Sequence, residues 1–206
     1  MRAIIAKSGP AAGGGVRDLA LIVFLYNTGA RVAEALAVKV EDLSLRRPRQ
    51  VRLHGKGGKD RMCPLWPETA RTLGALLDQQ GPGSTNGVVF RSARGGPLTR
   101  DGVAYLLTKY FRRAARDVSS LRDRRVTPHV LRHSCAVALL QAGVDLSVIR
   151  DYLGHASVAT TGRYLASNMD MKRKVLESFW ERAGLTNTRT RPWRPSKGTL
   201  EFLGSL

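Results

Sequence analysis

One β-hairpin pattern inside an otherwise helical sequence most constrains how this chain can fold. Residues 50–54 alternate apolar and polar side chains as a strand does, residues 55–58 form a glycine-rich turn, and residues 60–64 return as the partner strand. Helical patterns with capping signals dominate the rest of the chain as far as residue 153. The sequence therefore predicts a mainly α protein with a small antiparallel β-hairpin, an α+β fold.

Helix signals divide the chain into short segments with clear ends. Helices are predicted at 17–27, 31–36, 67–80, 99–117, 128–142, 145–153 and 171–183, and a short strand at 88–90. Residues 1–15 end in a glycine run and show no packing pattern, which predicts a flexible leader. One domain is expected over residues 16–184. The tail at 185–206 carries Trp193, Phe202 and Leu206, which favours docking, in cis or on a neighbouring protomer.

Charge is the strongest global property of the chain. Its 34 basic and 16 acidic residues give a formal net charge of +18, which indicates a polyanionic partner and salt-sensitive binding. A basic surface that only keeps the protein soluble is the alternative. No apolar run approaches the ~20 residues of a membrane span. Cys63 and Cys135 lie in different segments, which favours a reducing cytoplasm over a disulfide framework.

Chemically active side chains gather in one C-terminal stretch. His129 and Arg132 are three residues apart, so they share a helix face, and His155 and Tyr164 follow. A guanidinium holds a phosphate, an imidazole moves protons, and a tyrosine oxygen can attack phosphorus. This combination predicts phosphoryl transfer by a tyrosine nucleophile.

Five motifs in order resemble the catalytic domain of the tyrosine recombinase (phage integrase) family. They are Thr28-Gly-Ala-Arg31-Val-Ala-Glu34, Gly55-Lys-Gly-Gly-Lys-Asp-Arg61, His129-Val-Leu-Arg132-His133, Leu153-Gly-His155 and Tyr164. The resemblance covers about residues 16–180 and is nearest to integrases and transposases of bacterial mobile elements. Each motif alone is weak evidence, but five at compatible spacings are strong evidence.

The resemblance implies a role for each matching residue. Arg31 and Arg132 would contact the scissile phosphate, and Lys56 would protonate the departing 5′ oxygen. His129 and His155 would assist proton transfer. Tyr164 would attack phosphorus, giving a covalent 3′-phosphotyrosine without metal, ATP or another cofactor. The implied catalytic set is Arg31, Lys56, His129, Arg132, His155 and Tyr164.

Structural interpretations compete with these roles. Arg31 can form an ion pair with Glu34 on its own helix, and Lys56 can be a solvated turn lysine. A zinc helix would need a glutamate at position 130, where the chain has valine. His133 is left out of the site. Among the other tyrosines, Tyr26, Tyr105 and Tyr110 are expected in the core, and Tyr152 is expected to pack beside the Gly154 turn.

Double-stranded DNA is the expected partner, bound by a homo-oligomer, a tetramer in this family. DNA contacts are expected from Lys59, Arg61, Arg112, Arg113, Arg124 and Arg125. No membrane or small-molecule substrate is expected, since the chain has no dinucleotide fingerprint or P-loop. A non-cutting basic DNA-binding protein and a type IB topoisomerase remain alternatives. Family members commonly carry a further N-terminal domain. The pattern starting near residue 16 is therefore expected to be a short form, a fragment or half of a split system.

Overall fold

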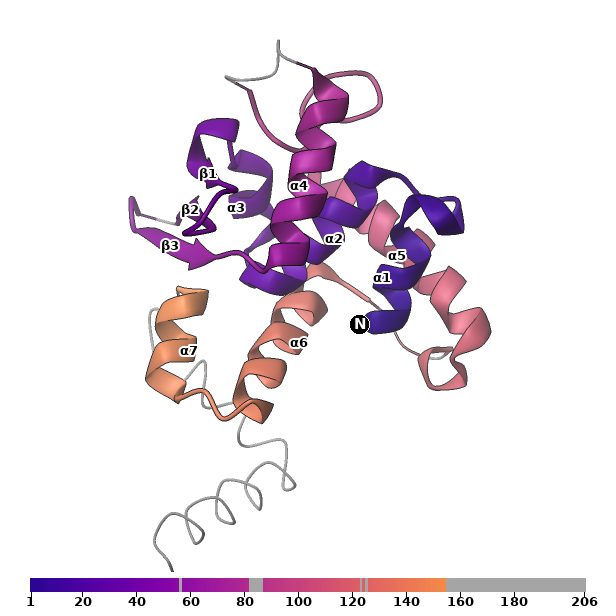
Figure 1. Cartoon of the computed structure of the whole chain (residues 1–206). Coiled ribbons are helices and arrows are strands. Elements are labelled where there is room, and N and C mark those ends of the chain that lie inside the picture. The colour runs from indigo at the N-terminus through magenta and orange to yellow at the C-terminus, as the bar shows by residue number, and fades with distance from the viewer. Residues whose placement is uncertain (56, 82–86, 123, 125, 155–206) are drawn as a thin grey trace, which may run out of the picture. The chain divides into compact units, whose positions relative to one another are not determined.

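The computed structural model describes residues 1–154 except 56, 82–86, 123 and 125 (Figure 1). These residues all belong to the first of two compact units, Met1–Ser167 and Asn168–Leu206. The α-helices are α1 (Arg2–Ser8), α2 (Val16–Thr28), α3 (Val32–Ala37), α4 (Pro67–Gln80), α5 (Arg100–Asp117), α6 (Pro128–Gln141) and α7 (Leu146–Leu153). Short 3-10 turns are η1 (Pro10–Ala12), η2 (Val40–Asp42) and η4 (Ser119–Leu121). The predicted helix at 171–183 and tail at 185–206 lie outside the described residues.

Helix α2 lies at the centre of the described part, packed against α1, α4 and α6 (Figure 1). Leu21, Ile22 and Phe24 on this helix are completely buried, and the Phe24 ring centroid lies 5.4 Å from that of Phe90. Burial on nearly all sides explains why the helix is apolar around most of its circumference. Among the described helices, none is both long and apolar enough to span a bilayer.

The sheet confirms the predicted hairpin and adds one strand. Strands β1 (Leu43–Ser44), β2 (Gln50–His54) and β3 (Asp60–Pro64) are antiparallel in the order β1-β2-β3. The turn after β2 contains Gly57 and Gly58, both with positive φ, a conformation that favours glycine. The strand predicted at 88–90 is wrong. Val88 forms only a single bridge, to Lys39, because this segment is too short to continue a ladder.

The predicted flexible leader at residues 1–15 is also wrong. Residues 2–8 form helix α1, which packs against α2 and α5. Ile4 is buried in the core, and Lys7 forms an ion pair with Asp117 at the end of α5. One buried isoleucine in a seven-residue helix is too brief a pattern to show helical periodicity, so tertiary packing decides the structure here.

Candidate active site

Three of the predicted catalytic residues line one cavity of about 360 Å³, referred to below as the arginine cavity. Arg31 is the N-cap residue of α3, while His129 and Arg132 lie one turn apart on α6. The structure therefore brings together side chains that are about 100 residues apart in sequence. The remaining predicted catalytic residues, Lys56, His155 and Tyr164, lie outside the described residues.

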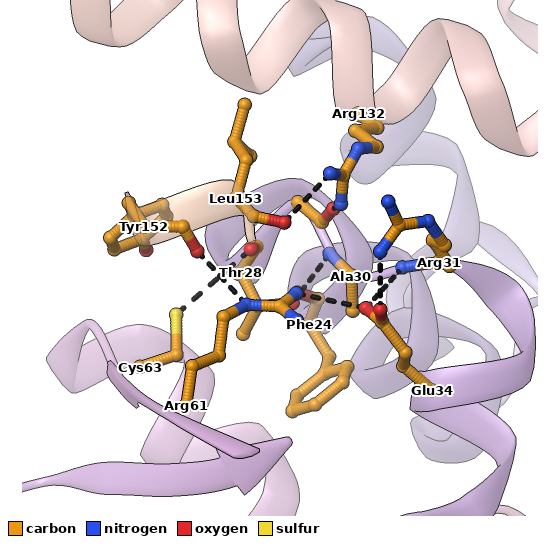
Figure 2. Close-up of polar contacts among 11 residues, drawn as sticks. Phe24, Thr28, Ala30, Arg31, Glu34, Arg61, Cys63, Arg132, Tyr152 and Leu153 are labelled. Atoms are coloured by element: carbon orange, nitrogen blue, oxygen red, sulfur yellow. Dashed lines mark hydrogen bonds and ion pairs between the residues drawn. The ribbon is translucent and has the colours of Figure 1, made fainter. Parts of the chain in front are cut away.

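Arg132 is buried and joins the end of α2 to the end of α7 (Figure 2). Its guanidinium donates to the Gly29 carbonyl at 2.6 Å and to the Leu153 carbonyl at 2.7 Å. Leu153 ends α7, where unsatisfied carbonyls favour a cation. Arg132 thus fastens the end of α7 beside the segment that leads into Arg31.

Gly29 makes this junction sterically possible. It ends α2 in the left-handed conformation, with φ of 57°. A Cβ at this position would displace the end of the Leu153 side chain, and the positive φ itself favours glycine. The missing side chain at Gly29 and the Arg132 hydrogen bonds therefore both allow the end of α7 to lie close to the end of α2.

Glu34 orients Arg31 from beneath (Figure 2). One carboxylate oxygen accepts from the Arg31 guanidinium at 2.7 Å, and the other accepts from the Arg31 backbone N–H at 2.9 Å and from the Arg61 guanidinium at 2.8 Å. Burial by itself raises the pKa of Glu34, but the hydrogen bonds from Arg61 and Arg31 outweigh it and lower that pKa. Arg31 therefore forms the anticipated ion pair and still presents a side chain that is 44% exposed.

Arg61 departs from its predicted role as a DNA contact. Its side chain is only 11% exposed, because the guanidinium binds Glu34 and donates to the Tyr152 carbonyl at 3.0 Å. The register explains this orientation: Arg61 lies opposite Leu53, which is on the buried face of the sheet. Two-residue alternation from Cys63, the apolar residue of the same strand, places Arg61 on the inner face, a signal that the sequence already contained.

Other predicted DNA contacts fall into two groups. Lys59, Arg112 and Arg124 are exposed, so they are accessible to a partner, and their role as DNA contacts stays a prediction. Arg112, Arg124 and Arg122 line a groove of about 490 Å³, the arginine groove, which shares Pro128 with the arginine cavity. Arg113 is half-buried and donates to the Ala12 carbonyl at 3.3 Å. Arg125 lies outside the described residues.

Sequence reasoning missed Arg100, which also lines the arginine cavity. This residue is exposed at the first position of α5, directly after the N-cap Thr99. A cation in the first turn of a helix opposes the helix dipole. An arginine in this unfavourable position was the signal in the sequence that could have identified it as a candidate.

Two of the described tyrosines have hydroxyls that are hydrogen-bonded inside the protein, which is unsuitable for a nucleophile. Tyr110 is buried and donates to Asp18 at 2.6 Å, and burial, followed by that contact, raises its pKa to about 12. The Tyr152 hydroxyl donates to the Asn27 carbonyl at 2.6 Å, and burial raises its pKa as well. These two predicted structural roles are confirmed. The prediction for Tyr105 is wrong, since this side chain is 69% exposed on α5.

Metal and thiol chemistry find no support in the described part of the chain. No three of its His, Cys, Asp and Glu side chains are grouped to hold a metal ion. Cys63 and Cys135 are buried free thiols, and burial raises their pKa values to about 11 and about 12. Both thiols therefore stay protonated near neutral pH, the unreactive form of the side chain.

Comparison with known proteins agrees with this arrangement. The model of the phage integrase family matches residues 2–171. Tyrosine recombinase XerD of Corynebacterium glutamicum is 37% identical over 82% of this chain and 54% of its own length. XerC of Roseiflexus castenholzii is 39% identical over 74% of this chain and 48% of its own length. The chain thus spans about half the length of these relatives.

Solved structures agree with the sequence relatives. The crystal structure of XerA recombinase has a TM-score of 0.72 and 30% identity, covering 86% of this chain and 62% of that one. XerH site-specific recombinase, bound to its palindromic difH substrate in a post-cleavage complex, has a TM-score of 0.69 and 28% identity, covering 86% and 50%. This chain belongs to the phage integrase family and has the catalytic-domain fold of the tyrosine recombinases.

Proposed function

We propose that this chain is the catalytic part of a site-specific DNA recombinase that cuts and rejoins DNA through a 3′-phosphotyrosine at Tyr164. The observation that carries the proposal is the arginine cavity, where Arg31, His129 and Arg132 converge from two helices. A scissile phosphate gains negative charge in the transition state, and two guanidiniums beside it stabilise that charge.

The proposed reaction exchanges one phosphorus–oxygen bond for another. The Tyr164 oxygen bonds to phosphorus, the bond to the 5′ oxygen breaks, and Lys56 supplies the proton that the leaving oxygen takes up. His129 and His155 assist removal of the phenol proton. The new phosphodiester retains the energy of the old one, so a 5′ hydroxyl can reverse the step without ATP. The proposed scheme assigns no step to a metal ion.

The path of DNA is proposed to follow the arginine groove into the arginine cavity. The two hollows meet at Pro128, and Arg112, Arg122 and Arg124 line the groove outside the cavity. Cations spaced along such a path bind successive phosphates without reading sequence. Lys59 and Arg100 would add contacts at the hairpin and at the cavity rim.

Single alanine substitutions of Arg112 or Arg124 test this path. Each is expected to weaken binding to a 30-base-pair duplex several-fold and to lower the slope of log K against log salt by about one. Fluorescence anisotropy from 50 to 300 mM salt measures both quantities. Arg71→Ala is the matched control, because Arg71 is exposed on α4 and paired with Glu68. Equal slopes for the groove variants and the control would refute the path.

The number of DNA strands broken during exchange between two duplexes determines the number of protein copies in the proposed assembly. The exchange breaks four strands, and each chain supplies one nucleophilic tyrosine, so four copies on two DNA sites are needed. XerH, the relative solved after cleavage, is on a palindromic substrate. A type IB topoisomerase would cut and reseal one duplex as a monomer, so the stoichiometry on DNA separates the two activities.

Metal-free DNA breakage is the test of the proposed function. Supercoiled plasmid is incubated with the protein in EDTA at low salt and quenched with SDS. We expect relaxed or nicked plasmid with protein attached, and a phosphotyrosine on the peptide containing Tyr164 after proteolysis. Plasmid that is bound but neither relaxed nor attached would favour the non-cutting DNA-binding protein instead.

A further inference from the structure

His54 has contacts that the proposed reaction does not use. It is the last residue of β2. Its Nδ1 lies 2.9 Å from an Asp60 carboxylate oxygen on β3, and its Nε2 lies 3.1 Å from an Asp42 carboxylate oxygen on η2. One imidazole therefore connects three separate elements, β2, β3 and η2, at the turn end of the hairpin.

The chemistry of these contacts specifies the protonation state of the ring. Ionised carboxylates only accept hydrogen bonds, and a neutral imidazole carries a single N–H. Both contacts are hydrogen bonds only when both ring nitrogens are protonated. Asp42 is also held in place, because its second oxygen accepts the Lys39 backbone N–H at 2.9 Å. The geometry consequently fits an imidazolium between two oriented carboxylates.

Surrounding charges favour the same form. The ring lies in a groove of about 580 Å³ whose charged or titratable lining residues are Lys39, Glu41, Asp42, Arg52 and His54 itself. The ring also contacts Asp60 on β3. Glu41 is paired with Lys39 at 3.2 Å, which leaves Asp42, Arg52 and His54 as the other charged or titratable side chains that line the groove. Hydrogen bonds to Asp60 and then to Asp42 raise the pKa of His54 above its ordinary value.

This arrangement of Asp42, His54 and Asp60, called the clamp below, lies next to the turn that contains Lys56. Directly after His54, the Gly55 N–H donates to the Lys59 carbonyl at 3.0 Å, and this bond closes the turn. His54 and Asp60 form the last register pair of the hairpin before that bond. A change in the distance between these two side chains is therefore transmitted directly to the turn.

We propose that His54 is a positioning residue whose imidazolium, bridging Asp42 and Asp60, fixes the turn end of the β2–β3 hairpin and so the turn that carries Lys56. The proposal rests on the proposed function in that it assigns Lys56 to the reaction. It adds a dependence on pH. The raised folded-state pKa means that the clamp is complete below the unfolded pKa of about 6.5 and is lost as pH rises through the folded value.

Amide hydrogen exchange and ring nitrogen shifts test the clamp without DNA. In the full chain at pH 6, His54→Gln is expected to lower the protection factor of the Gly55 amide about threefold, the size typical of an exposed ion pair. Above the folded pKa the difference should disappear. His54→Lys keeps a charge throughout, so its Gly55 protection should stay constant with pH. Glu68→Gln, which removes an exposed carboxylate on α4, is the matched control.

Nitrogen-15 shifts of the wild-type ring need no variant and remain informative if a variant fails to fold. Two protonated nitrogens at pH 6, with a pKa that falls in Asp60→Asn, support the clamp. A ring that titrates near 6.5 in both proteins, or Gly55 protection unaffected by His54→Gln, overturns it.

Activity on plasmid then connects the clamp to the reaction. We expect His54→Gln to relax plasmid about threefold more slowly than wild type at pH 6 and at an equal rate at high pH. An equal rate at both pH values would overturn the link to Lys56. If wild type itself does not cut, the exchange and shift measurements still decide whether the clamp exists, so failure of the proposed function is recognised separately.

Discussion

Arg132→Ala is expected to lower the free energy of unfolding by about 3 kcal/mol and to abolish DNA cleavage. The substitution leaves two buried carbonyls, those of Gly29 and Leu153, without their guanidinium donor, and an unsatisfied buried acceptor costs about 1–3 kcal/mol. It also removes one of the two cations proposed to face the phosphate. Urea unfolding and the plasmid assay in EDTA measure the two effects.

Comparison with Arg31→Ala separates the effect of an arginine on unfolding stability from its effect on DNA cleavage. Arg31 is 44% exposed, and its partner Glu34 keeps the ion pair with Arg61 when Arg31 is lost. This variant is therefore expected to unfold at nearly the wild-type urea concentration while cleavage falls at least a hundredfold. Arg132→Lys serves if Arg132→Ala does not fold, since an ammonium can still donate to one carbonyl. Wild-type stability in Arg132→Ala would disprove the structural role of the guanidinium.

Tyr164→Phe is expected to eliminate covalent attachment to DNA, a loss of at least a thousandfold, and to leave salt-dependent DNA binding nearly unchanged. The substitution removes only the attacking oxygen, so the electrostatic contacts to phosphate persist. SDS-resistant protein–DNA adducts on plasmid and anisotropy on a duplex measure the two properties in the same preparation.

Tyr105→Phe is the matched control for the nucleophile. Tyr105 is the most exposed tyrosine in the described part of the chain, whereas Tyr110 and Tyr152 have buried hydroxyls engaged by Asp18 and Asn27. The control should cleave at the wild-type rate. Adducts that persist in Tyr164→Phe and vanish in Tyr105→Phe would transfer the proposed role to α5.

Local signals predicted most of the fold. The bounds of β2, β3 and α4 match the expected residues, because proline, glycine and alternation mark their ends clearly. Helix α5 begins where Thr99 was expected to cap it, with the Thr99 hydroxyl accepting the Gly102 N–H at 3.1 Å. The errors occurred in short segments, α1 and residues 88–90, where packing against distant residues outweighs local preference.

Prediction of the candidate site was limited by side-chain direction rather than by residue type. The family motifs placed Arg31, His129 and Arg132 together, and the arginine cavity confirms that they are neighbours. Motif matching treated Arg61 as a surface cation, whereas strand register turns it toward Glu34. Arg100 belongs to no quoted motif, and only the packing of α5 brings it to the cavity.

The Arg132 bridge to Leu153 also limits where the following residues can lie. Tyr164 follows Leu153 by eleven residues, so its Cα can lie no farther than about 40 Å from the residue that Arg132 fastens. The entropic cost of bringing two points of a chain together grows only with the logarithm of the number of residues between them. In the proposed reaction, a buried arginine that fastens Leu153 therefore raises the concentration of the attacking phenol near the phosphate, in addition to its proposed contact with that phosphate.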